Sequence, residues 1–278
     1  MRNEWTEKIA RALEEIKRKK PLVHHITNYV TANGCANVTL AIGASPVMAD
    51  APEEVRDIVS ISSALVLNIG TLHARTVESM IAAGREANAL QLPVVFDPVG
   101  AGASAYRSAA AMRILSEVRC SVVRGNISEI GFLAGQGAGA KGVDAAEADM
   151  AGNTGRARSV AVAAAKKLDC AVAVTGPVDV ISGGGRTLSI ENGTALLSGV
   201  TGTGCMCTSL VGAFCGAASD YLAAAAGGVL AMGIAGELAE MKSGGRGPGS
   251  FYTGIIDAIG CLDGEEIGRR ARIYEDGV

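Results

Sequence analysis

The middle of the chain alternates short, wholly apolar runs with longer segments of mixed polarity. The apolar runs have the length of buried strands and lie at Ala64–Gly70, Pro93–Pro98, Cys120–Asn126 and Cys170–Gly176. The intervening segments predict helices at residues 72–91, 105–118, 127–134 and 155–168. Continuous apolar strands separated by helices are typical of a parallel sheet covered on both faces. The pattern therefore predicts an α/β fold with a mostly parallel central sheet and helices on both faces.

Other patterns extend this sheet and its helices. Residues 178–190 form two alternating runs around a glycine cluster, which predicts a hairpin and thus an antiparallel edge to the sheet. Trp5, Ile9, Leu13 and Ile16 recur at helical spacing, so the chain should open with an amphipathic helix. The segment 203–263 reads as mostly helical. Residues 135–155 are rich in glycine and alanine and predict a surface excursion. No linker or repeat divides the chain, so we expect a single domain over residues 1–278.

Charge excludes two classes of partner. The 25 Lys and Arg residues against 28 Asp and Glu residues give a net charge of −3. A protein that binds nucleic acid or an anionic membrane normally carries a basic face, so neither partner is expected. Between Glu191 and Glu237 the only charged residue is Asp220, but glycine, serine and threonine interrupt this stretch near 198–204. We therefore expect two buried helices there and no membrane span.

The cysteine and glycine content predicts where the protein is located and how closely its backbone packs. The seven cysteines are an odd set without paired spacing, as is typical of reduced core thiols. The first twenty residues lack the apolar core of a signal peptide, so we expect a cytoplasmic protein. Glycine accounts for 37 of 278 residues, which predicts close backbone packing and sites where the backbone itself touches a ligand.

Polar residues or glycines follow each predicted parallel strand. These residues are Asn68 and Gly70, Asp97 and Pro98, Arg124 to Asn126, and Thr175 and Gly176. In an open α/β sheet, ligands bind beyond the carboxyl ends of the strands, so these residues should converge on one site. A carboxylate, a guanidinium, an amide and a hydroxyl suit a phosphate plus a metal ion. The alternative is that Asp97 and Asn126 only cap the helices that follow them.

The sharpest local feature is a glycine-rich turn, residues 199–204, that leads directly into an apolar helix. The unpaired N–H groups of a first helical turn form an anion site, and glycine lets a phosphate approach the backbone. The alternative is a plain loop before a helix. The chain has no Walker P-loop and no G-x-S-x-G elbow, and Cys205 and Cys207 lack the partners of a zinc site. These absences leave both interpretations of the glycine-rich turn open.

Taken together and in order, several motifs resemble the hydroxyethylthiazole kinases, which have the ribokinase-like fold. The matching stretches are His25–Val30, Ala36–Asn37, Ala41–Ala49, Asn68–Thr71, Val95–Ala101, Arg124–Asn126 with Glu129, Val174–Gly176 and Thr201–Met206. They cover residues from about 20 to about 260 of the sequence. The resemblance implies ATP-dependent phosphorylation of 4-methyl-5-(2-hydroxyethyl)thiazole, a step of thiamine salvage. It also implies a homotrimer with sites at the subunit interfaces.

The resemblance also implies a role for each matching residue. Arg124 and Thr175 would contact ATP, and Met48, Gly202 and Asn28 would contact the thiazole alcohol. Asp97 and Glu129 would hold Mg²⁺, directly or through water, with Asn126 opening their N-x-x-E motif. The N–H groups of Gly202, Thr203, Gly204 and Cys205 would form an anion hole for the moving phosphoryl group.

Two of these residues keep alternative interpretations. Sugar and vitamin kinases of the wider fold usually carry Asp where this chain has Cys205. A helix N-terminus lowers a thiol pKa, so Cys205 could accept the alcohol proton as a thiolate, or it could only orient the hydroxyl. Met48 could rest against the thiazole ring, or Ser45–Met48 could be a buried core strand.

Rival functions keep the fold and change the substrate. A hydroxymethylpyrimidine kinase, a pyridoxal kinase or an ADP-forming dehydratase would use the same nucleotide site. A non-catalytic nucleotide- or vitamin-binding regulator is a further alternative, which Asp97, Arg124, Glu129 and the Gly-Thr-Gly-Cys segment argue against.

Overall fold

The computed structural model describes residues 4–136 and 150–276. A nine-stranded sheet in the order β2-β1-β3-β4-β5-β6-β7-β8-β9 forms its centre. The first six strands of this order are mutually parallel, as the alternation of apolar runs and helices predicts. They are β2 (Ser45–Met48), β1 (Leu22–Ile26), β3 (Ala64–Asn68), β4 (Val94–Asp97), β5 (Val122–Asn126) and β6 (Ala171–Thr175).

Three antiparallel strands complete the other edge. The hairpin of β7 (Asp179–Gly183) and β8 (Arg186–Ile190) confirms the prediction for residues 178–190. Strand β9 (Ile273–Glu275) then pairs with β8, where Trp5 Nε1 of the first helix donates to Glu275 Oε2 at 3.0 Å. The two ends of the described chain therefore meet at this edge.

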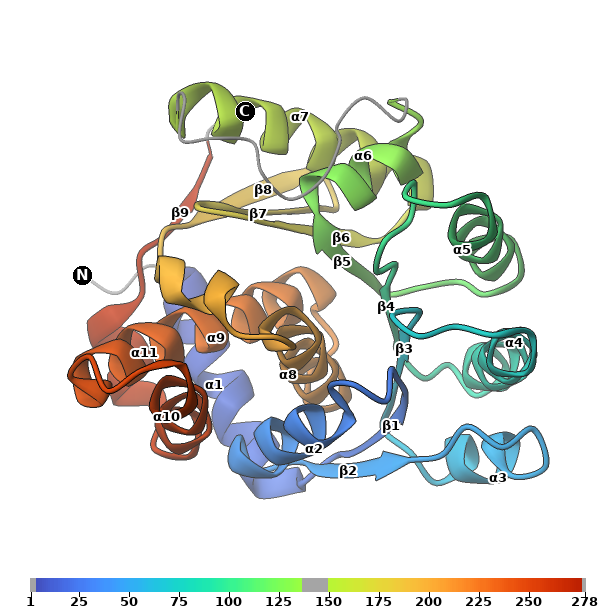
Figure 1. Cartoon of the computed structure of the whole chain (residues 1–278), viewed down its shortest axis with the longest axis horizontal. Helices are drawn as coiled ribbons and strands as arrows, with labels where there is room; N and C mark the ends of the chain where they lie inside the picture. The colour runs from blue at the N-terminus through green and yellow to red at the C-terminus, as the bar shows by residue number, and fades with distance from the viewer. Residues whose placement is uncertain (1–3, 137–149, 277–278) are drawn as a thin grey trace.

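Helices cover both faces of the sheet (Figure 1). One face carries α1 (Glu4–Lys19), α2 (Ala32–Ala41), α8 (Thr203–Ala217), α9 (Tyr221–Ser243), α10 (Pro248–Gly260) and α11 (Gly264–Arg270). The other carries α3 (Val55–Ser60), α4 (Ala74–Ala89), α5 (Ala105–Glu117), α6 (Ile127–Ala134) and α7 (Met150–Leu168). A short 3-10 helix, η1 (Ala195–Gly199), precedes α8.

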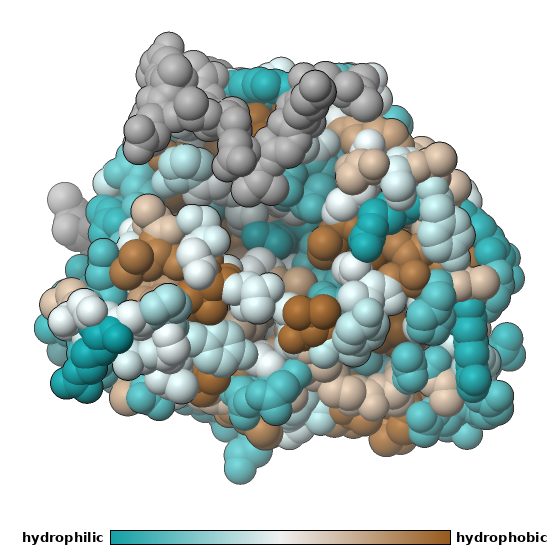
Figure 2. All heavy atoms as spheres, viewed as in Figure 1, coloured by the Kyte–Doolittle hydropathy of each residue, from teal (hydrophilic) through white to brown (hydrophobic). Residues whose placement is uncertain are grey.

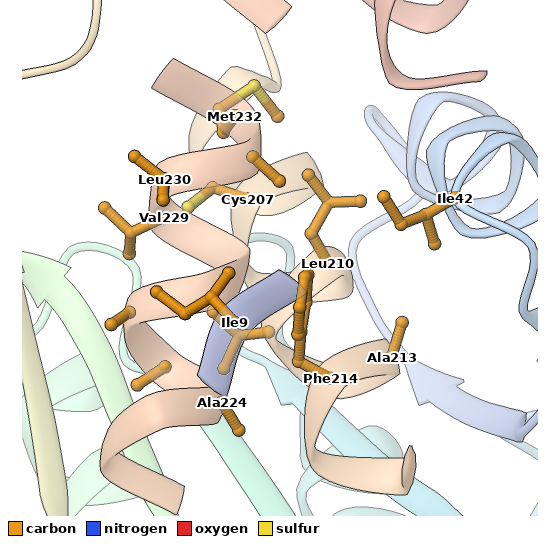
Figure 3. Close-up of a cluster of buried hydrophobic side chains, with 14 of the residues drawn as sticks. Ile9, Ile42, Cys207, Leu210, Ala213, Phe214, Ala224, Val229, Leu230 and Met232 are labelled. Atoms are coloured by element: carbon orange, nitrogen blue, oxygen red, sulfur yellow. The ribbon is translucent and has the colours of Figure 1, made fainter. Parts of the chain in front are cut away.

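The strands send alternate side chains into two separate cores. Val66 of β3 belongs to the core under α8 and α9, whereas its neighbours Leu65 and Leu67 belong to the core under α3 to α7. This alternation explains why the strands are apolar along their whole length. Figure 3 shows part of the larger core, which includes Leu210 and Phe214 of α8 and Val229 of α9.

Helix α9 is long and apolar enough to cross a membrane by composition, but 89% of its apolar window is buried inside the protein. This agrees with the expectation of buried helices between Glu191 and Glu237. Its packing on α8 is close, because a Cβ on Gly228 would lie 2.5 Å from the backbone nitrogen of Val211. On the face shown in Figure 2, apolar residues are scattered among polar ones. Most of the predicted excursion at 135–155 lies outside the described residues.

The strand register sets up the site. Asn68, the last residue of β3, pairs with Asp97, the last residue of β4. Asn126 at the end of β5 pairs likewise with Thr175 at the end of β6. The polar residues that follow each apolar run therefore lie side by side at one end of the sheet.

Candidate functional site

Asp97 lies at the centre of this end of the sheet and is fully buried. Its Oδ2 accepts hydrogen bonds from Asn68 Nδ2 at 2.8 Å and from Thr208 Oγ1 at 2.7 Å. Burial raises the pKa of the Asp97 carboxyl to about 6, against the lowering influence of Arg124. Asp97 does not cap the next helix, because Ser104 Oγ accepts the Arg107 N–H at the start of α5. The capping alternative is therefore wrong for Asp97.

Arg124 on β5 brings a cation beside this carboxylate. Its Nη1 lies 4.0 Å from Asp97 Oδ2, and its Nη2 donates to Thr175 Oγ1 at 2.5 Å. The guanidinium also rests on the first turn of α8, where a Cβ on Gly204 would lie 2.8 Å from Nη1. Glycine at 204 therefore allows the cation to approach the helix N-terminus.

The N-terminus of α8 has the features of an anion site. Its N-cap is Gly202, which adopts φ +90, a left-handed conformation that glycine enters without strain. The first N–H groups of a helix lack intrahelical partners, here those of Thr203, Gly204 and Cys205. Their positive ends and the Arg124 guanidinium lie together, which suits a phosphate group.

Asn126 and Glu129 form a reciprocal cap at the start of α6. Asn126 Oδ1 accepts the N–H groups of Ser128 at 3.0 Å and Glu129 at 2.9 Å, which confirms the capping alternative for Asn126. Glu129 Oε2 in turn accepts the Asn126 N–H at 2.8 Å, and Oε1 accepts the Gly100 N–H at 2.8 Å. Glu129 thereby ties the loop after β4 to the end of β5.

Cys205 lies on the first turn of α8 and faces two asparagines. Asn28 Nδ2 and Asn68 Nδ2 each donate to Cys205 Sγ at 3.2 Å. Burial, together with the neighbouring Asp97 carboxylate, raises the pKa of the Cys205 thiol. This is opposite to the lowering that the helix N-terminus alone predicts, and it disfavours a resident thiolate.

Met48 ends the edge strand β2 and is 39% exposed. The interpretation of Met48 as a core residue is therefore wrong. In the parallel register Met48 pairs with His25, so it lies at the same end of the sheet as the loop that carries Asn28. Tyr29, Val30 and Leu40 are also largely exposed in the neighbouring loop and helix α2.

Thr208 and Thr31 were not predicted as site residues, and Asn68 was predicted only as one of the strand ends that converge on the site. Asn68 joins Cys205 to Asp97, and Thr208 is a fully buried polar residue on the apolar helix α8, one turn after Cys205. Thr31 donates through its N–H and its Oγ1 to Asn28 Oδ1, at 3.0 and 2.9 Å. The sequence signal for Thr208 is a hydroxyl three residues after Cys205, on the same helical face.

The carboxylates fit a magnesium ion of the kind that substrate phosphates complete. Asp97 Oδ1 is buried and has no hydrogen-bond partner among the described residues. Residues 4–136 and 150–276 contain no cluster of three or more His, Cys, Asp or Glu side chains that could hold a metal ion. Mg²⁺ in phosphoryl-transfer sites usually takes one or two carboxylates plus phosphate oxygens and water, so a single free carboxylate oxygen is compatible with it.

Solved structures share this fold. A hydroxyethylthiazole kinase structure from Pyrococcus horikoshii superimposes with a TM-score of 0.87 at 38% identity, covering 97% of this chain and 99% of that one. A pyridoxal kinase from Staphylococcus aureus, in complex with pyridoxal, gives a TM-score of 0.58 at 15% identity. A ribokinase-like superfamily protein from Enterococcus faecalis gives 0.62 at 12% identity. The latter two show the fold alone, and this fold is the ribokinase-like one that the sequence predicts.

Sequence relatives cover nearly the whole chain. Hydroxyethylthiazole kinase from Ruminiclostridium cellulolyticum is 58% identical over 273 residues, which are 98% of this chain and 99% of the relative. The enzyme of the same name from Clostridium beijerinckii is 57% identical over 275 residues, 99% of this chain and 100% of the relative. The model of the hydroxyethylthiazole kinase family matches residues 13–265. With these matches and a strand-end site of this composition, the chain belongs to the hydroxyethylthiazole kinase family.

Proposed function

We propose that this kinase transfers the γ-phosphoryl group of ATP to the hydroxyl of 4-methyl-5-(2-hydroxyethyl)thiazole, as a step of thiamine salvage. The observation that carries the proposal is the convergence of Asp97, Arg124 and the N-terminus of α8 on one end of the sheet. Family membership supports the choice of ATP as the phosphoryl donor and of the thiazole alcohol as the acceptor.

The phosphates of ATP bind at the positive end of the site. Phosphoryl transfer passes through a loose transition state with charge spread over the equatorial oxygens, so positioned positive groups do most of the work. Arg124 supplies planar, bidentate donors to phosphate oxygens, and Thr175 orients its guanidinium. The N–H groups from Gly202 to Cys205 hold the moving phosphoryl group as it develops charge.

The base of the nucleotide has an adjacent hollow. A recess lies beside Thr175, between the start of α6, helix α7 and the turn after β6. Ile127, Ala157, Val174 and Pro177 give it mainly apolar walls. A flat aromatic base suits such a recess, and Thr175 would then join the base pocket to the phosphate site.

Asp97 and Glu129 would hold Mg²⁺. When bound, the ion would supply positive charge that offsets the negative charge of the phosphate oxygens. The free Oδ1 of Asp97 is the direct ligand of choice, because both Glu129 oxygens already accept backbone N–H groups and reach the ion best through water. Arg124, beside Asp97, stabilises the ionised carboxylate that the ion requires.

The acceptor alcohol binds between the ends of β1 and β2 and the start of α8. Asn28 and Gly202 approach it from the inner side, and Met48 offers an apolar, polarisable surface to the thiazole ring. Cys205 lies where the hydroxyl meets the phosphoryl group. Since its thiol pKa is raised, Cys205 orients the hydroxyl in this proposal more readily than it deprotonates it.

The proposed assembly is a homotrimer with sites at the subunit interfaces, built from one domain per chain and located in the cytoplasm. The exposed apolar side chains of Tyr29, Val30, Leu40 and Met48 beside the edge strand β2 support an interface there. The seven free cysteines support a reducing compartment.

A panel of alcohols tests the function directly. The purified protein, ATP and Mg²⁺ are incubated with the thiazole alcohol, hydroxymethylpyrimidine and pyridoxal, and ADP release and phosphorylated product are both measured. We expect kcat/KM for the thiazole alcohol to exceed the others by at least about 100-fold. Preference for pyridoxal or the pyrimidine would move the chain to a rival substrate, and ligand binding without ATP consumption would support a regulator.

A further inference from the structure

Two asparagine side chains converge on one atom in the site. Asn28 and Asn68 come from the loop after β1 and from the end of β3, far apart in sequence. Each directs its Nδ2 at Cys205 Sγ over 3.2 Å. Two N–H donors on one acceptor atom is the arrangement by which proteins hold an oxyanion.

The orientation of both amides is determined by their other partners. Asn28 Oδ1 accepts the backbone N–H of Thr31, and Asn68 Oδ1 accepts the backbone N–H of Gly70 at 2.9 Å. Within an amide side chain only the oxygen can accept from an N–H group, so the NH₂ group of each asparagine must face the sulfur. The second hydrogen of Asn28 Nδ2 goes to Asn68 Oδ1 at 3.0 Å, and that of Asn68 Nδ2 goes to Asp97 Oδ2.

The backbone beneath Asn68 is held from outside the site. Arg107 on α5 donates from Nη2 to the carbonyl of Gly70 at 2.7 Å and from Nη1 to the carbonyl of Ile69 at 2.7 Å. It also donates to the carbonyl of Val99, in the loop that follows Asp97, at 2.8 Å. The loops after β3 and β4 are thus clamped together, and the peptide that orients Asn68 cannot rotate freely.

We propose that Asn68 is a positioning residue for phosphoryl transfer, which together with Asn28 forms a two-donor cradle that holds the side chain of residue 205 beside Asp97. The role in transfer rests on the proposed function, whereas the cradle itself rests on the hydrogen bonds above. A thiol is a weak acceptor, and a carboxylate takes N–H bonds about twice as strong as neutral ones. The cradle is therefore better matched to an anionic acceptor at residue 205 than to the cysteine present.

The test compares the decrease in kcat caused by Asn68→Ala in three backgrounds, which have Ala, Cys or Asp at position 205. Asn68→Ala removes the hydrogen bond to Asp97 in all three backgrounds, so only the contact with residue 205 differs among them. We expect Asn68→Ala to lower kcat about twofold in the Cys205→Ala background, about fivefold when Cys205 is present, and about thirtyfold in the Cys205→Asp background. A merely structural role of Asn68 predicts the same factor in all three, and that result would overturn the proposal.

Asn28→Ala in the same backgrounds provides the second arm, because Asn28 donates to the sulfur and makes no hydrogen bond to Asp97. It should give the same ordering. Asn88→Ala is the matched control: Asn88 bonds the backbone of Arg119 at the other end of the sheet, so kcat should not change.

Urea unfolding of the same variants tests the cradle without any substrate. The destabilisation caused by Asn68→Ala should also rise from Ala to Cys to Asp at position 205. Absence of thiazole kinase activity in the unaltered protein would sink the proposed function but leave this unfolding series informative. If Asn68→Ala lowers the free energy of unfolding by the same amount whichever residue is at position 205, the cradle is refuted, whatever the activity.

Discussion

Arg124 and Asp97 face each other at 4.0 Å without a closing hydrogen bond, because Arg124 Nη2 donates to Thr175 instead. The carboxylate takes its hydrogen bonds from Asn68 and Thr208, both uncharged. The cation and the carboxylate are therefore near enough to stabilise each other's charge and separate enough for each to engage a ligand. A phosphate chain with its metal ion is the ligand that uses both.

Replacing Arg124 tests the cationic half of this pair. Arg124→Met removes the charge beside the α8 N-terminus, and we expect kcat/KM for ATP to fall about 100-fold, as the loss of charge-assisted bonds implies. Arg124→Lys should recover only part of it, since an ammonium cannot contact Thr175 and a phosphate with planar geometry. Steady-state kinetics with varied ATP measure both. Arg113→Met, at an exposed ion pair with Glu78, is the control, and equal effects at both positions would refute the assignment.

Cys205 should contribute to turnover without being indispensable. A loose transition state needs little help from a base, so Cys205→Ala should keep measurable single-turnover activity. Cys205→Asp should be tolerated or improved, because a carboxylate there can receive the amide hydrogens of Asn28 and Asn68. If Cys205→Ala shows no loss when chemistry limits the rate, the cysteine has no chemical role. Complete inactivity of the folded variant would make it an obligatory base.

Glu129→Gln separates structure from metal binding. Glutamine has one oxygen, so it can no longer accept both the Gly100 and the Asn126 N–H groups through separate atoms. We expect the free energy of unfolding, measured with urea, to fall by about 1–2 kcal/mol. We also expect a higher Mg²⁺ concentration for half-maximal activity. Glu78→Gln, at an exposed ion pair, should change neither. An unchanged Mg²⁺ requirement in Glu129→Gln would remove Glu129 from the metal site.

The buried histidines should make stability sensitive to acid. Burial lowers the pKa of His25 to about 4, against 6.5 for the free side chain, and lowers the pKa of His24 as well. Below pH 6.5 the unfolded chain therefore binds more protons than the folded one, so His25 withdraws stability as pH falls toward 4. By about pH 5, His25 should have lowered the free energy of unfolding by on the order of 2 kcal/mol.

Comparison with His25→Asn isolates this contribution. Asp97 and Asp179 act in the opposite sense, because burial raises the pKa of Asp97 to about 6 and that of Asp179 to about 7. Their contribution cancels when the two proteins are compared at each pH. The stability difference between wild type and His25→Asn, measured by urea unfolding, should shrink from about pH 7.5 to about pH 5. A difference that stays constant would contradict a buried neutral His25.

Met48 tests the assembly. A charge on the exposed apolar surface beside β2 should oppose association, so Met48→Glu should shift the sedimentation coefficient from that of a trimer to that of a monomer. Activity should fall as well, because Met48 also contacts the thiazole ring in the proposed site. Leu90→Glu, at another exposed apolar side chain, is the control. Wild-type protein that sediments as an active monomer would contradict the proposed assembly.

The parallel strands were predictable because each is a continuous apolar run that ends in a polar residue. Leu65 and Val66 face opposite cores, and two-sided burial leaves that signature in any such strand. Strand β9 was not predictable, since its three residues pair with β8 about 85 positions earlier along the chain, a tertiary contact with no local signal. The edge strand β2, half-exposed and interrupted by Pro46, is also weak in local signal.

The location of the site was predictable from the sequence, but the hydrogen bonds within it were not. Asp97 and Arg124 follow from the rule that strand ends converge, and the structure places them together. Asn126 could be read as ligand or cap, and only its contacts show that its oxygen caps α6. The raised thiol pKa of Cys205 depends on burial and on Asp97, neither of which local sequence specifies. Asn68 was visible as a strand end, yet its two-sided contact with Cys205 and Asp97 exists only in three dimensions.

A crystal structure with a non-hydrolysable ATP analogue, Mg²⁺ and the thiazole alcohol measures the central claim most directly. The account predicts the terminal phosphate over the N–H groups of Gly202 to Cys205, with Arg124 on its oxygens and the alcohol oxygen beside Cys205 Sγ. A triphosphate bound elsewhere, with Asp97, Arg124 and Cys205 all out of reach of it, would contradict the account.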